Sequence, residues 1–120
     1  MKRALASGSL IFLSLLVVVG CRSAFVSTTI TNNSGSRITL LEVDYPSASF
    51  GVGTLASGAQ FHYRFKIQGS GPVKLQFTDG LGKTRSASGP DIHEGEQGTL
   101  QINIDSSGNI SWIPNLSKIR

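Results

Sequence analysis

The amino-acid sequence predicts an all-β fold for residues 25–114, a small antiparallel β-sandwich of immunoglobulin-like architecture with about seven or eight strands. Two observations predict it. Ser, Thr, Asn, Gln and Gly supply 44 of the 100 residues that follow Gly20, and Gly or Pro recurs so often that helices of ordinary length have little room. Apolar residues instead alternate with polar ones in short runs, which is the pattern of half-buried strands.

The first predicted strands lie on either side of a turn-forming segment. Residues 26–31 precede Asn-Asn-Ser-Gly at 32–35, where Asn and Gly tolerate positive φ, so we expect a hairpin turn there. In residues 37–45 the apolar alternation changes phase at Leu40, and a β-bulge near this residue would explain the change. Residues 50–55 are the next short strand.

The clearest alternation lies in residues 60–68, where every second residue is aromatic or Ile. A second alternating run covers 73–78, and the intervening Gly-Ser-Gly-Pro is typical of turns, so we expect the two runs to form a hairpin. We favour the register that places Phe65 opposite Phe77, because the alternative places two lysines opposite each other.

Three further strands are predicted in the C-terminal third, at residues 83–88, 100–104 and 110–113. The first of them begins with charged residues, which favours an edge position, and it follows a turn at 79–82. Residues 105–109 are expected to form an Asx-type turn. Pro114 is expected to end the last strand, which leaves 115–120 as a loose tail.

Residues 1–20 differ in composition from the rest, since they hold 13 of the 47 apolar residues. Lys2 and Arg3 give the segment a positive start, and Leu10 to Val19 is an almost unbroken apolar run. Ten residues rise about 15 Å as a helix, half of the roughly 30 Å hydrocarbon core of a bilayer. The segment is therefore predicted to be a secretory signal peptide, with a transmembrane anchor as the alternative.

The apolar run ends in Val18, Val19, Gly20 and Cys21, where a small residue precedes the only cysteine of the chain. This motif resembles the lipobox of bacterial lipoproteins. The resemblance implies that the Cys21 thiol receives a diacylglyceryl group, that the leader is cut just before Cys21, and that the new amino group is acylated. The alternatives are ordinary signal cleavage and a cysteine that lies in the leader by chance.

Cysteine usage supports the same interpretation. With one Cys no intramolecular disulfide can form, and a free thiol would be a liability on an exported protein unless acylation consumes it. Two acyl chains give stable membrane anchoring, whereas one is marginal. Residues 21–24 would be the lipidated cysteine and a short tether. In lipoproteins of this kind, an Asp directly after the cysteine resembles a signal that retains the protein in the inner membrane. This chain has Arg22 at that position, which favours the outer membrane if the host has one.

The rest of the chain, with its Asn-Asn-Ser-Gly turn, Tyr-Arg-Phe-Lys strand and Gly-Pro-Asp-Ile-His-Glu loop, resembles small bacterial lipoproteins that have no assigned activity. The resemblance implies a place in the cell envelope and brings no reaction with it. No Gly-x-Ser-x-Gly elbow follows residue 20, and only His62 and His93 could serve as imidazole bases. We therefore expect neither an enzyme nor a cofactor.

Two groups of residues are candidates for ligand binding. His62, Arg64 and Lys66 share the polar side of one predicted strand, and one loop contains Asp91, His93, Glu94 and Glu96. Each group has an ordinary explanation: the strand residues can be a solvated sheet face, and the loop spacing matches no metal signature.

Without Lys2 and Arg3 the chain has nine basic and seven acidic residues, a net charge too small to indicate nucleic-acid binding. We expect a membrane-anchored envelope lipoprotein whose non-enzymatic β domain serves protein interaction or structural support. Its partners would be the bilayer, through Cys21, and another envelope protein. The alternative is an envelope ligand-binding module for a glycan or a divalent metal.

Overall fold

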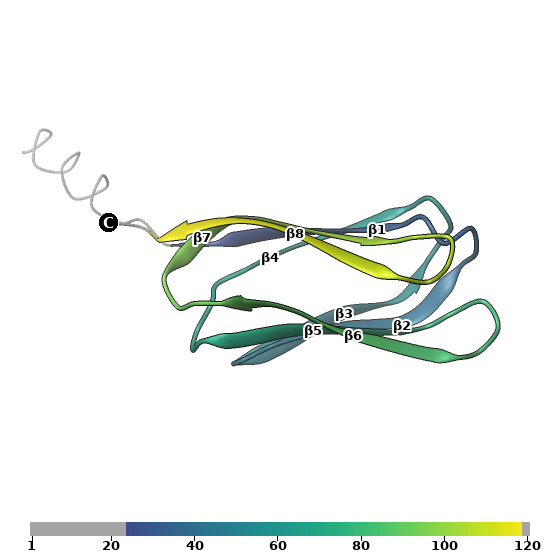
Figure 1. Ribbon diagram of the computed structural model, residues 1–120, viewed down its shortest axis with the longest axis horizontal. Coiled ribbons are helices and arrows are strands. Elements are labelled where there is room, and N and C mark those ends of the chain that lie inside the picture. Colours follow the sequence, from purple (N-terminus) through teal and green to yellow (C-terminus); the bar gives the residue numbers. More distant parts are fainter. Residues whose placement is uncertain (1–23, 119–120) are drawn as a thin grey trace, which may run out of the picture.

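The computed structural model describes residues 24–118, so the predicted signal peptide and Cys21 lie outside the described residues. The described residues form eight strands (Figure 1): β1 (Val26–Asn32), β2 (Ile38–Tyr45), β3 (Ala48–Leu55), β4 (Gln60–Phe65), β5 (Gly71–Thr78), β6 (Thr84–Ile92), β7 (Glu96–Ile104) and β8 (Ile110–Lys118). They contain no helix long and apolar enough to cross a bilayer.

The strands form two four-stranded sheets, in the orders β4-β1-β7-β8 and β3-β2-β5-β6. The sheets lie face to face as two layers (Figure 1), which confirms the predicted β-sandwich. All pairs are antiparallel except β1 with β7, which is parallel. Because of this pair, the first strand lies in the middle of its sheet.

The core lies between the sheets and is built from the inward-facing half of each alternating strand. In β5, for example, Val73, Leu75 and Phe77 are buried and the residues between them are exposed. Trp112 of β8 packs over Gly89 of β6, where an added Cβ would lie 2.6 Å from the indole ring. A glycine at this position therefore lets the tryptophan cover one side of the sandwich.

The predicted hairpin between residues 60–68 and 73–78 is wrong. Strand β4 belongs to one sheet and β5 to the other, so Phe65 pairs with Val26 and Phe77 with Arg85. The segment 66–70 crosses between the sheets instead of turning back within one. Alternation shows which residues of a strand share a face. The apolar faces of both sheets point into the same core here, so alternation does not show which strand is the neighbour.

The segment 32–35 is also a crossover between sheets and not a hairpin turn, because β1 and β2 lie in different sheets. Asn32 is fully buried at its start. Its Nδ2 lies within 2.8, 3.0 and 3.1 Å of the carbonyl oxygens of Ser36, Leu55 and Ala56, to which it donates. Its Oδ1 accepts from the backbone N–H and the hydroxyl of Ser34. One side chain thus joins the β1–β2 crossover to the end of β3.

Several local predictions are confirmed. The register of β2 against β5 shifts between Thr39 and Glu42, and Leu40 has φ of 52°, as a bulge there requires. Asp105 Oδ1 accepts from the backbone N–H groups of Ser107 and Asn109 at 2.9 Å, which closes the predicted Asx-type turn. Strand β6 is an edge strand, as expected.

The prediction that Pro114 ends the last strand is wrong, because β8 continues through it to Lys118. Pro114 pairs with Leu100 of β7, and β8 is the outermost strand of its sheet. An edge strand tolerates proline where the missing N–H would point away from the neighbouring strand. Residues 115–118 are therefore part of the sheet and not of a loose tail.

Replacing Asn32 with Ala should destabilise the fold by about 2–4 kcal/mol, because buried carbonyl groups lose their donor. Denaturant unfolding of the protein measures this loss. The control is Asn33→Ala, which removes only an exposed side-chain hydrogen bond to Asn103 and should cost under about 1 kcal/mol. Equal losses in the two variants would contradict the role assigned to Asn32.

Candidate functional site

The outward face of the β4-β1-β7-β8 sheet consists mainly of uncharged polar side chains. The strand registers place Ser27 between Arg64 and Thr99, and Thr29 between His62 and Gln101. The outward rows across the four strands are Arg64-Ser27-Thr99-Asn115, His62-Thr29-Gln101-Ile113 and Gln60-Thr31-Asn103-Ser111. Such a face offers many hydrogen-bond donors and acceptors and few charges.

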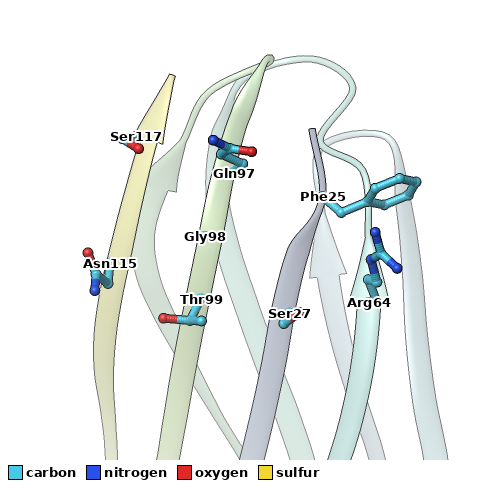
Figure 2. Close-up of a pocket in the computed structure, with 8 residues that line it drawn as sticks. All are labelled: Phe25, Ser27, Arg64, Gln97, Gly98, Thr99, Asn115 and Ser117. Atoms are coloured by element: carbon cyan, nitrogen blue, oxygen red, sulfur yellow. The ribbon is translucent and has the colours of Figure 1, made fainter. Parts of the chain in front are cut away.

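A shallow cleft of about 570 Å³ lies at one end of this face. Its lining comes from all four strands and the residue before β1 (Figure 2): Phe25, Ser27, Arg64, Gln97, Gly98, Thr99, Asn115 and Ser117. The volume is in the range of small-molecule sites, but the cleft is open and mainly polar, unlike the apolar pockets that bury most of a ligand. It suits a polar ligand held from one side.

Arg64 is the one charged side chain in the cleft lining. Its guanidinium carbon lies 4.2 Å from the centre of the Phe25 ring (Figure 2), a cation–π contact that orients the group but leaves its charge uncompensated. Among residues 24–118, no carboxylate forms an ion pair with Arg64.

Arg85, at the other end of the molecule, shows the contrasting case. Its Nε donates to Asp79 Oδ2 at 2.8 Å, and this hydrogen bond is the largest cause of the lowered pKa of Asp79. The charge of Arg85 is therefore matched within the fold. The charge of Arg64 remains available to an anionic group from outside the described domain.

Gly98 lets β7 and β8 approach at the floor of the cleft. Its φ is 137°, which side chains rarely adopt, and a Cβ there would overlap the backbone oxygen of Asn115. Gly98 and the polar residues around the cleft, apart from Arg64, were not predicted from the sequence. The sequence shows only that each of these residues points outward in its own strand. Because the order of strands in the sheet was not predicted, their grouping into one cleft could not be predicted either.

His62 and Arg64 do share the outward side of β4, as predicted, where His62 Nδ1 lies 3.1 Å from the hydroxyl of Thr29. Lys66 lies beyond the end of β4 in the crossover to the other sheet. Lys74 does not lie beside Arg64 as the predicted hairpin required, because Lys74 belongs to β5 in the opposite sheet.

The acidic loop uses its carboxylates to hold the backbone. Glu96 Oε1 accepts from the backbone N–H of His93 at 2.6 Å, and Glu94 Oε1 accepts from that of Gly69 at 2.7 Å. Asp91 pairs with Pro72 inside the sheet. In the part of the chain that the structure describes, no three His, Cys, Asp or Glu side chains are grouped to hold a metal ion. The carboxylates of Glu94 and Glu96 therefore stabilise the backbone at this end of the fold.

Comparison with known proteins adds no identification. No family model matches this chain, and no curated protein or solved structure compared with it does.

Proposed function

We propose that this protein is an exported bacterial lipoprotein, anchored in a membrane of the cell envelope by acylated Cys21, whose β domain binds another envelope component without catalysing a reaction. The observation that carries the proposal is the lipobox-like motif that ends at Cys21. If the host has an outer membrane, that membrane is the favoured location.

The position of β1 supports close attachment to the bilayer. Four residues separate Cys21 from Val26, the first residue of β1, and these span at most ~14 Å when extended. The start of β1 lies beside Gly98 and Phe65, so the end of the sandwich that carries the cleft would lie nearest to the headgroups. Strand β7 has nine residues and rises about 30 Å. The loops at the other end of the sandwich would therefore lie well above the membrane surface.

A binding role, and not catalysis, fits the side chains that the fold brings together. His62 contacts a threonine hydroxyl and His93 lies beside Glu96. Acyl transfer needs a nucleophile beside a base that a third group orients. The Thr29 hydroxyl and His62 form an exposed pair, and within residues 24–118 no third group hydrogen-bonds to the His62 ring. The polar sheet face instead offers a broad surface for association.

Replacing Cys21 with Ser should move the protein from the membrane fraction to a soluble or uncleaved form and abolish labelling with radioactive palmitate, because the thiol that carries the acyl chains is gone. Fractionation of cells that express each form measures this. The matched control is Ser23→Ala, which should remain in the membrane fraction. A Cys21→Ser protein that still sediments with membranes and still labels would overturn the lipoprotein proposal.

The second candidate function is glycan binding at the cleft, and the unpaired Arg64 beside the Phe25 ring favours it. Hydroxyl and amide side chains can match sugar hydroxyls, an aromatic ring can pack on a sugar face, and a guanidinium can hold a carboxylate or phosphate. The metal alternative receives no comparable support.

If the cleft binds an acidic glycan, Arg64→Gln should weaken binding on a glycan array by roughly tenfold or more, since a charge-assisted hydrogen bond is lost. Lys66→Gln removes the same charge outside the cleft and should leave binding unchanged. Equal binding by both variants, or binding of the native protein to no acidic glycan, would exclude this second function.

A further inference from the structure

The four edge strands of the sandwich differ in how they are protected from pairing with another chain. Natural sheets protect their edges with charged residues, prolines, bulges or short strands. Strand β6 contains Arg85 and Pro90, β8 contains Pro114 and Lys118, and β4 has only six residues, among them Arg64. Strand β3 has the sequence ASFGVGTL, with neither charge nor proline.

A groove of about 590 Å³ lies along the outer face of β2 and β3 beside this unprotected edge. Two glycines of β3, Gly51 and Gly53, help to form it. A Cβ at Gly51 would overlap the backbone oxygen of Leu41, whereas one at Gly53 would meet nothing within 4 Å. The groove is thus open at Gly53, which lines it together with Leu40.

Leu40 is the second unusual feature of the groove. It is 69% exposed and has φ of 52°, a left-handed conformation that is uncommon for residues other than Gly and Asn. The bulge in β2 therefore turns a large apolar side chain toward solvent while Leu41, the next residue, stays buried. An exposed apolar side chain held in a strained conformation is typical of contact sites.

Two carboxylates face the same region. Glu42 lies across from Gly51 and Asp44 across from Ser49, so small residues of β3 stand between each acid and the sheet edge. Asp44 raises the pKa of Glu42 through a side-chain hydrogen bond and through the repulsion of its charge. Lys74 of β5 lies across from Asp44, but among residues 24–118 neither carboxylate forms an ion pair.

We propose that β3 receives an extended peptide segment of a partner protein as an added strand. Basic side chains of the segment would reach Glu42 and Asp44 on the outer face, with their methylene stems near Leu40. The apolar side chains would pack near Tyr63 on the inward face. The added strand would lie about 9.6 Å from β2, two interstrand spacings. A Lys or Arg side chain can reach the carboxylates over the glycine and serine positions of β3. Backbone hydrogen bonds would supply affinity, and the alternating side chains would supply selectivity.

The inward side of the β3 edge suits the apolar half of such a segment. The ring of Phe50 stacks on that of Tyr63 with centroids 4.1 Å apart, and Tyr63 is 40% exposed. Tyr45 and Phe65 stack beside them at 4.3 Å. An apolar side chain of the added strand would cover the exposed part of this aromatic cluster.

Charge complementarity favours a basic partner over a second copy of this chain. Strand β3 has no cation to offer, so a second copy of this chain paired at the β3 edge would bring no basic side chain to Glu42 and Asp44. Antiparallel pairing would also point the two anchored ends in opposite directions, which conflicts with attachment to one membrane by a short tether.

The partner assignment rests on the proposed interaction function, but its test does not depend on anchoring. Full-length protein in non-ionic detergent is titrated into a fluorescein-labelled eight-residue peptide of alternating Val and Lys, and anisotropy is measured. A peptide with Glu in place of Lys, and one with alternate backbone amides methylated, serve as controls. We expect the Val-Lys peptide to bind at least roughly tenfold more tightly than either.

Two protein variants locate the binding. Gly53→Lys adds a cation at an open position of β3 and should weaken binding roughly tenfold or more, whereas Ser86→Lys adds the same charge to the opposite edge strand of the same sheet and should change it little. Glu42→Gln should weaken binding of the Val-Lys peptide without lowering the melting temperature, because the substitution relieves the repulsion from Asp44. Amide hydrogen exchange should show protection in residues 48–55 when the peptide is bound.

Three results would overturn the proposal. No binding of the Val-Lys peptide at millimolar concentration, or equal losses in Gly53→Lys and Ser86→Lys, would remove β3 as the docking edge. A concentration-dependent dimer, seen by light scattering and abolished by Gly53→Lys, would assign the edge to a second copy. Failure of the Cys21→Ser fractionation test would overturn the lipid anchor and leave this binding result unaffected.

Discussion

The architecture depends most on the hydrogen bonds of the Asn32 side chain. In a sandwich whose chain changes sheets repeatedly, backbone groups leave one hydrogen-bond ladder before they reach the next, and inside the molecule they need other partners. Asn32 supplies such partners to the β1–β2 crossover and to the end of β3 at once. Its own backbone also bonds to Gly58 and Ala59, at the end of the β3–β4 crossover, directly before β4. Asn32 therefore positions the β1–β2 crossover and the β3–β4 crossover relative to each other.

Local chemistry made much of the fold predictable from the sequence, and the pairing of distant strands did not follow from it. The phase change at Leu40 predicted the bulge, and the Asp-to-Asn segment at 105–109 predicted the closed turn, because neighbouring residues determine both. The partner of β4 could not be found in this way, since Phe65 faces the core whether its neighbour is β5 or β1. Pro114 was misread because its effect depends on whether β8 lies at an edge, which is a property of the whole sheet.

The same limit applies to the candidate site. Arg64 was identified as a polar-side residue of an alternating strand, but its importance comes from what surrounds it: a Phe ring, a polar cleft built from other strands, and no ion pair within residues 24–118. The two surfaces singled out by the structure have opposite chemistry. The cleft on the β4-β1-β7-β8 sheet presents an unpaired cation, and the β3 edge presents two carboxylates and an exposed Leu40. A domain anchored at the end where β1 begins would leave the β3 edge free along its side, available to an extended segment of a neighbouring protein.

The most direct test of this account is site-specific photo-crosslinking in intact cells. A benzophenone amino acid is placed at position 53, where the structure leaves open space for a side chain, and at position 86 on the opposite edge of the same sheet. The account predicts a discrete adduct with another envelope protein at position 53 and none at position 86, and the adduct should disappear when Cys21 is replaced with Ser, because the protein then leaves the membrane. Adducts of equal yield at both positions, or none at position 53, would contradict it.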